Sequence, residues 1–224
     1  MTDSEWIDLT QPITEDVATH PPGHPMPEFE DYATYDEDGY NATILHLETH
    51  CGTHMDAPTH MLPTEEYDTI EAVTPAQMVT EGVVLDLTGV GRGEAITPDD
   101  LESATADVPI EADDFVILDT GMDPTETETE TYLHEYAYPG VDAAEYLVDA
   151  GAAVVATDAL GVDAPGASIA DHDVHRTLLP AGVRIVEGVA NLGEVAYGRY
   201  DVVCTPLPYV GRDGSQVRLL VRPQ

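Results

Sequence analysis

The chain has 224 residues, of which 42% are apolar, so it can bury a core, and we expect one domain over residues 1–224. It carries 44 acidic residues against seven basic ones, all arginine, for a formal net charge of −37. This charge argues against binding to nucleic acid or anionic membranes, because both interactions depend on Lys and Arg. The missing lysine and the scattered acids indicate adaptation to molar salt, where the Debye length is about 3 Å. The alternative is an acidic surface that serves only solubility.

In the first third of the chain, the residue pattern predicts short strands separated by residues that break regular structure. WIDLTQPI at 6–13 reads as a strand, and the Pro-rich segment at 14–32 shows no helical period. Residues 41–50 alternate well enough for a strand, which then meets Gly52, Pro58 and Pro63. These residues break helix and strand alike, so we expect an irregular segment there.

The rest of the chain alternates apolar strands with helices. Thr-Pro pairs at 74–75 and 97–98 predict helix starts, and residues 143–150 predict another helix. Buried strands are expected at 82–87, 115–120, 152–158 and 183–189, and a last pair of strands, 202–204 and 217–221, frames an Asp-Gly turn at 213–214. TETETET at 125–131 predicts a polar loop that is a candidate flap. The fold class is therefore α/β with a mixed sheet.

Targeting signals and disulfides are not evident. The segment MTDSEWIDLT lacks the basic and apolar regions of a secretory signal, and no apolar run approaches the ~20 residues of a membrane span. Cys51 and Cys204 form no disulfide framework. We expect a reduced, cytoplasmic protein.

The segment HCGTHMDAPTH, residues 50–60, concentrates potential metal ligands. His50, His54 and Asp56 offer two imidazoles and a carboxylate within seven residues, and a tight loop can bring all three to one ion. Zn²⁺ and similar divalent metals accept this mixture of nitrogen and oxygen ligands. A single histidine is usually structural, and His46 is interpreted so. Cys51 is expected to be a packed thiol rather than a ligand.

A second group of candidate ligands lies at 171–192. His172 and His175 are both candidates, and Glu187 sits within the apolar strand VRIVEGV. A carboxylate in such a strand is costly unless a cation or hydrogen bonds compensate it. A metal explains it, whereas an exposed strand face is the alternative.

These segments resemble the metal-dependent cyclase family, which includes bacterial kynurenine formamidase and isatin hydrolase. The hallmark of that family, His-x-Gly-Thr-His-x-Asp-x-Pro-x-His, matches HCGTHMDAPTH at every fixed position. The likeness extends to DLTQPI, TDALGVD, HRTLLPAGVRIVEGVANL and PLPYVGRDGSQVR. The resemblance implies a swivelling β/β/α domain that assembles as a homodimer or homotetramer.

The resemblance also implies a two-metal site, with two Zn²⁺ per subunit or Mn²⁺ in their place. His50, His54 and Asp56 match the ligands of the first ion. Asp56, His175 and Glu187 match those of the second, and the twelve-residue step from His175 to Glu187 selects His175 over His172. His60 matches the proton donor and acceptor of the family.

The implied activity is hydrolysis of a small amide, and the nearest named reaction is that of arylformamidase, N-formylkynurenine to kynurenine and formate. The tryptophan that lines the substrate pocket in kynurenine formamidase is replaced here by His20, within Ala18–Gly23. His20 is thus a candidate substrate-binding residue, which can stack, bind a substrate carboxylate or approach the metals. Isatin-like lactams or other cyclic amides are alternative substrates, and a metal-binding protein without turnover is the alternative from another class.

Overall fold

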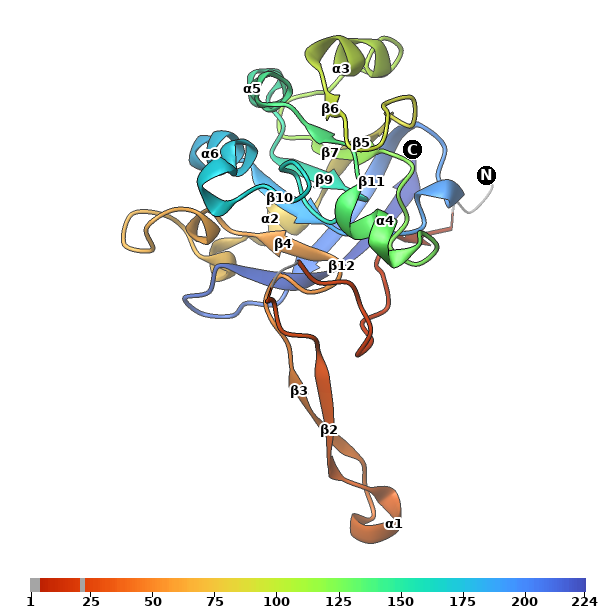
Figure 1. Ribbon diagram of the computed structural model, residues 1–224, viewed down its shortest axis with the longest axis vertical. Coiled ribbons are helices and arrows are strands. Elements are labelled where there is room, and N and C mark those ends of the chain that lie inside the picture. Colours follow the sequence, from red (N-terminus) through yellow and green to blue (C-terminus); the bar gives the residue numbers. More distant parts are fainter. Residues whose placement is uncertain (1–4, 21–22) are drawn as a thin grey trace.

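The computed structural model describes residues 5–20 and 23–224, and a mixed sheet forms its centre (Figure 1). The strand order is β1-β12-β11-β5-β7-β9-β10-β4, and β12 also pairs with β4. This last pairing closes the strands from β12 to β4 into a barrel, and β1 pairs with β12 outside that ring. The strands of this sheet are β1 (Ile7–Asp8), β4 (His54–Asp56), β5 (Val79–Asp86), β7 (Phe115–Asp119), β9 (Val154–Thr157), β10 (Arg184–Glu187), β11 (Gly198–Pro206) and β12 (Gly214–Pro223).

Four neighbouring strands of the sheet, β5, β7, β9 and β10, are parallel. Parallel neighbours need crossover connections, and helices supply them on the outside of the barrel. The apolar residues of α3, α5 and α6 pack in one cluster with the outward-facing residues of these strands. The helices are α3 (Pro98–Ala104), α5 (Val141–Ala150) and α6 (Asp173–Leu178).

The inside of the barrel is a second apolar cluster. Alternate residues of the same strands point there, among them Val84, Phe115, Ile117 and Val186. The short helix α2 (Pro75–Met78) packs beside it through Met78, and a capping box between Thr74 and Gln77 begins this helix. The predicted α/β class with a mixed sheet is confirmed, and each buried strand and helix start predicted between residues 74 and 189 is present.

A hairpin of β2 (Glu28–Ala33) and β3 (Ala42–His46) leaves the barrel as an arm, with α1 (Tyr35–Asp38) at its tip (Figure 1). The Pro-rich segment therefore contains a strand that its composition did not predict, and the strand predicted over 41–50 already ends at His46. Residues 47–53 form the turns that return the chain to the barrel. Pro21 and Pro22 of the segment lie outside the described residues.

Two further expectations are corrected by tertiary context. The expected irregular segment after Gly52 contains β4, because β10 and β12 supply hydrogen-bonding partners on both sides of His54–Asp56. The polar loop predicted at 125–131 is a turn only at its start, since α4 (Thr129–His134) begins within it and buries Tyr132. β6 (Ala95–Ile96) and β8 (Tyr138–Pro139) form a small parallel pair. Across the described residues, no helix combines the length and apolar character needed to cross a bilayer.

Candidate metal centre

The register between β4 and β10 builds the centre. His54 lies opposite Glu187 and Asp56 lies opposite Ile185, so the side chains of His54, Asp56 and Glu187 meet on the outer face of the barrel. His54 Nε2 is 3.4 Å from both Asp56 Oδ1 and Glu187 Oε2. All three residues are buried. Two segments more than a hundred residues apart in sequence thus contribute to one polar cluster.

Two atoms of this cluster are buried without a hydrogen-bond partner among the described residues, namely His54 Nε2 and Asp56 Oδ2. His54 Nδ1 is 2.9 Å from the carbonyl of Gly52, which accepts its proton and leaves Nε2 with a free lone pair. Gly52 makes this possible because it adopts a positive φ of 70° in the turn before β4. Buried polar atoms are usually paired, so an unpaired nitrogen facing two carboxylates fits a role as a cation ligand.

His50 lies in the turn before β4 and faces two carboxylates. Its Nδ1 is 2.7 Å from Asp56 Oδ1, and its Nε2 is 2.8 Å from Asp213 Oδ2. Burial acts to lower the pKa of His50, but the charge of Asp56 and the hydrogen bonds to both carboxylates outweigh it and raise the pKa to about 10. The ring fits here because Gly214 has no side chain: a Cβ there would lie 2.9 Å from His50 Cε1.

His175 reaches the cluster from α6. Its Nδ1 donates to Asp163 Oδ2 at 2.5 Å, and its Nε2 lies 3.4 Å from Asp56 Oδ2 and 3.6 Å from Glu187 Oε1. A carboxylate that holds one ring nitrogen orients the other, as in the carboxylate–histidine pairs of metal sites. His172 does not reach the cluster in this way, because its ring stacks on His175 with the centroids 5.5 Å apart.

The two carboxylates at the centre are held in the ionised form. Burial acts to raise the pKa of Asp56, but the nearby His60, His50 and His175 and the hydrogen bond from His50 hold it well below its usual range. Burial likewise opposes ionisation of Glu187, but the neighbouring imidazoles of His20, His54 and His175 outweigh it and lower the pKa of Glu187. Two adjacent buried carboxylates form a strongly anionic site, which favours a divalent cation.

His60 ends a short 3₁₀ turn, Pro58–His60, and lies at the edge of the centre. Its ring centroid is 4.0 Å from that of His50 and 5.4 Å from that of His175. Its Nδ1 is 3.8 Å from Asp213 Oδ2, and the hydrogen bond from His50 together with the nearby His60 lowers the pKa of Asp213. His60 is therefore close enough to the centre to exchange protons with a molecule bound there.

A cavity of about 290 Å³ opens over the centre and is lined by both polar and apolar residues. His20 lines it, with Nε2 donating to the Leu160 carbonyl at 2.9 Å and lying 3.9 Å from Glu187 Oε2. His20 was considered for stacking on the substrate, for binding a substrate carboxylate and for approaching the metals. These distances agree with the third role. The apolar and aromatic part of the cavity wall is formed by Leu133, Tyr136 and Met61. This volume is at the small end of ligand pockets.

Sequence reasoning singled out every histidine and carboxylate at the centre except Asp163 and Asp213. Both occur in segments quoted for the family resemblance, TDALGVD and PLPYVGRDGSQVR, but Asp213 was interpreted only as part of a turn. Cys51 is fully buried, and burial raises the pKa of its thiol to about 11, which agrees with a packed thiol. His46 lies on the exposed arm, 3.7 Å from Glu30.

The donor set fits divalent metal ions. His50, His54 and His175 supply ring nitrogens, and Asp56 and Glu187 supply carboxylate oxygens, which is a mixture that zinc and manganese accept. The unpaired atoms of His54 and Asp56 are free to act as ligand atoms. Fold and site together define an α/β protein with a buried carboxylate–imidazole centre of the kind that binds divalent metals.

Comparison with known proteins gives the family. Residues 7–164 match the family described as putative cyclase, and the chain belongs to this cyclase family. The resemblance drawn from HCGTHMDAPTH is thereby confirmed. Kynurenine formamidase of Bacillus cereus is 29% identical over 230 aligned positions, which cover the whole of both chains.

Two solved structures support the fold. A protein of Bacillus stearothermophilus described as a "predicted metal-dependent hydrolase" is 30% identical, with a TM-score of 0.75 over 98% of both chains. Isatin hydrolase A from Labrenzia aggregata has a TM-score of 0.87 at 22% identity, over 97% of this chain and 93% of its own. The second likeness concerns the fold alone, and it confirms the fold class that the resemblance implied.

Proposed function

We propose that residues 1–224 form one metal-dependent hydrolase domain that cleaves a small amide at a two-metal centre. The chain is a hydrolase of C–N bonds other than peptide bonds. Its relatives named kynurenine formamidase and isatin hydrolase have activities of the same class. The observation that carries the proposal is the pair of buried, unpaired ligand atoms on His54 and Asp56, which lie beneath a cavity.

The ligand sets are those that the family resemblance implies, and the contacts of Asp56 with His50, His54 and His175 support them. His50, His54 and Asp56 would hold the first ion, and Asp56, His175 and Glu187 the second. Zinc is the metal proposed, with manganese as an alternative, because imidazole and carboxylate suit both. Asp163 positions His175 through the hydrogen bond at Nδ1.

The chemistry follows from the contacts around the cavity. Divalent metals supply hydroxide from water near neutral pH and polarise a carbonyl oxygen. His60 takes a proton from the attacking water and returns one to the leaving nitrogen, since imidazole exchanges protons near neutrality. Asp213 Oδ2, 3.8 Å from His60 Nδ1, helps to position the ring of His60 for this transfer. Met61, Leu133 and Tyr136 hold the organic part of the substrate and exclude water.

An aryl formamide such as N-formylkynurenine is the substrate class proposed, because kynurenine formamidases match this chain from end to end. An isatin-like lactam is the second candidate. The small cavity favours it, and His20 presents a smaller ring to the substrate than tryptophan would. A screen of N-formylkynurenine, formylanthranilate, isatin and small lactams separates the two.

Substitution of His60 tests the proton-transfer role. His60→Ala should retain bound metal by elemental analysis but lose at least about 100-fold in kcat, since general acid–base catalysis contributes about that much or more. His46→Ala on the exposed arm is the matched control and should keep full activity. Full activity in His60→Ala would refute the role.

Metal removal tests the centre itself. Treatment with EDTA should abolish turnover, and Zn²⁺ or Mn²⁺ should restore it. Activity that survives complete metal removal would contradict the proposal. Two bound metals with no turnover of any amide would instead favour the metal-binding protein without catalysis.

The exposed arm supports assembly as a homodimer or homotetramer. Between residues 28 and 46 only Ala33 is buried, and a lone hairpin is marginally stable in water. The arm nevertheless carries large apolar side chains that are exposed: Phe29, Tyr32, Tyr35, Tyr40, Ile44 and Leu45. Tyr32→Ser with Leu45→Ser should shift the mass measured by light scattering toward one chain; an unchanged mass would contradict the arm's role.

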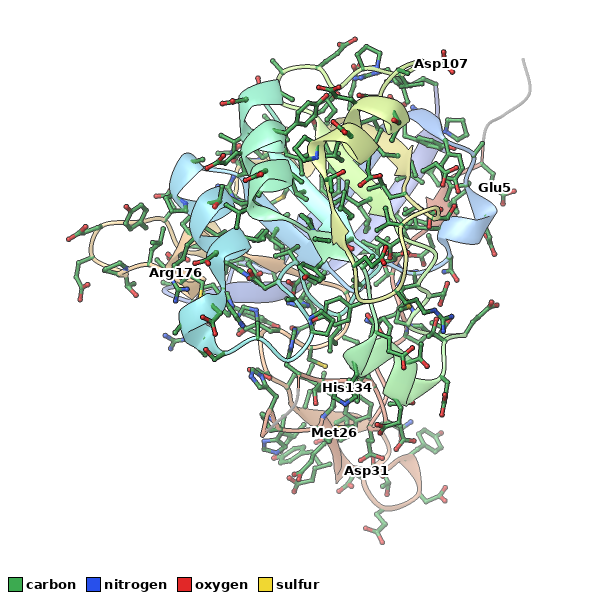
Figure 2. All side chains as sticks on the ribbon, turned by 45° about the horizontal axis from the view of Figure 1, so that its top comes forward. Glu5, Met26, Asp31, Asp107, His134 and Arg176 are labelled. Atoms are coloured by element: carbon green, nitrogen blue, oxygen red, sulfur yellow. The ribbon has the colours of Figure 1, made fainter. Side chains whose placement is uncertain are left out.

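The charge supports adaptation to molar salt. Glu5, Asp31 and Asp107 point outward at separate edges of the molecule (Figure 2). Only Arg199, Arg218 and Arg222 form arginine–carboxylate ion pairs within the described residues, so most acids have no cation beside them. Salt should therefore stabilise the fold by screening repulsion. Equal free energies of unfolding in low and multimolar KCl would contradict this.

A further inference from the structure

A second cavity, of about 420 Å³, lies away from the metal centre, at the ends of the parallel strands where those strands begin. Phe115, Val154 and Arg184 are the first residues of β7, β9 and β10, and all three line it. Glu187 of the metal centre is the last residue of β10. The two cavities have no lining residue in common.

Arg184 is the unusual member of this lining. Its side chain is buried, with 8% of the residue exposed, yet its Nε has no hydrogen-bond partner in the described part of the chain. None of the carboxylates placed by the structure lies within ion-pair distance of it, whereas Arg199 is 2.8 Å from Asp114. Burial lowers the pKa of Arg184, and the charge of Asp68 opposes this only from a distance.

A guanidinium that is largely buried and has no counterion is costly, because part of its solvation is lost and no protein carboxylate replaces it. Carboxylates are abundant in a chain of net charge −37, yet none of those described pairs with Arg184. The guanidinium is therefore free to pair with the carboxylate of a bound ligand. The planar guanidinium matches a carboxylate, which it binds through two parallel hydrogen bonds.

The other walls define the rest of the ligand. Met55, Val73, Phe115 and Val154 are buried apolar residues of the barrel interior, so they favour an apolar body. Thr74, Gln77 and Thr80 are also part of the lining and offer polar groups. Asp113 also lines the cavity and is exposed, and its charge disfavours phosphate or a dicarboxylate.

We propose that this cavity binds a small monocarboxylate with an apolar body, its carboxylate paired with Arg184. The proposal concerns a site separate from the metal centre and does not depend on the hydrolase reaction. A ligand here would contact Met55, which points to the opposite side of β4 from His54 and Asp56.

Nuclear magnetic resonance of the Nε–H groups tests the proposal on the metal-loaded protein labelled with ¹⁵N-arginine. The probe is benzoate, and benzamide is the neutral analogue of the same shape. The Arg184 signal is assigned by triple-resonance correlation of its side chain with the backbone, and its loss in Arg184→Met checks the assignment. At constant ionic strength, benzoate should shift this signal saturably, and benzamide should bind at least about tenfold more weakly, because it lacks the charge.

Two variants separate this site from benzoate bound elsewhere, including at the metals. Ala76→Trp fills the exposed side of the cavity next to α2 while keeping Arg184, so it stays informative if Arg184→Met does not fold. It should weaken the benzoate-dependent shift of Arg184 at least about tenfold. Arg92→Met, outside the cavity lining, should leave that shift unchanged.

Three results would overturn the proposal. The first is an Arg184 signal that benzoate does not move. The second is an equal response to benzamide, or to chloride at the same concentration, because either would remove the requirement for a carboxylate on an apolar body. The third is a full response in Ala76→Trp, which would place the bound benzoate elsewhere.

Discussion

The two faces of β4 differ in what they contribute. On the outer face, His54 and Asp56 place polar atoms in a buried cluster, and two of those atoms lack hydrogen-bond partners among the described residues. On the inner face, Met55 packs in the apolar interior with 1% of its surface exposed. The outer face is arranged for binding cations at a cost in stability, whereas the inner face stabilises the barrel. Because side chains alternate along a strand, three consecutive residues serve both purposes.

The largest effect is expected on the outer face, from Asp56→Asn. The variant loses a carboxylate that is proposed to contact both ions, so turnover should fall by roughly 10³-fold or more. Its free energy of unfolding without metal should also fall, because the lowered pKa of Asp56 means that its ionised carboxylate stabilises the metal-free fold. Kinetics and denaturant unfolding of the metal-free proteins measure the two. Activity near that of the wild type would contradict the role of Asp56.

On the inner face, a substitution should reduce stability and leave most of the turnover. Met55→Ala leaves a cavity in a packed interior and should reduce the free energy of unfolding by about 2–5 kcal/mol. The folded fraction should retain metal and most of its turnover, since the substitution leaves the outer face unchanged. Urea unfolding monitored by circular dichroism gives the stability. A loss of turnover without a loss of stability would show that the two faces are not separable.

A smaller effect is expected from Asp213→Asn, at a residue that contacts a proposed metal ligand but is not itself one. Asp213 contacts His50 and His60 rather than the proposed ion positions, and such supporting residues typically account for about 10–100-fold in metal affinity or activity. Metal titration and kcat/KM measure the two quantities. A loss as large as that of Asp56→Asn would make Asp213 a direct participant.

The smallest effect is expected at a side chain that faces neither interior nor centre. Val210, in the loop between β11 and β12, is 78% exposed. Val210→Ser should change the free energy of unfolding by no more than about 0.5 kcal/mol, and kcat should not change. A larger loss of stability, by the same urea titration, would indicate that this loop is covered in the assembled protein.

The elements that could be predicted from sequence were those with a strong local signal. The apolar run FVILDT and the Thr-Pro pairs at 74–75 and 97–98 depend on residues within a few positions of one another, and the strand and helices are present as predicted. β4 and β2 have weaker patterns. β4 exists because β10 and β12 pair with it, and β2 because it pairs with β3, so no local pattern could decide either.

The sequence by itself determined the family and the set of candidate ligands, because HCGTHMDAPTH and the step from His175 to Glu187 are chemical patterns written in residue order. Only the tertiary structure decided which atoms meet. The register of β4 on β10 sets His54 opposite Glu187, and the hydrogen bonds of Asp163 and Asp213 orient His175 and His50. It also decided that Arg184 lines a cavity in which none of the described carboxylates comes within ion-pair distance of it. Strand register and burial depend on contacts between distant parts of the chain, which spacing along the sequence does not contain.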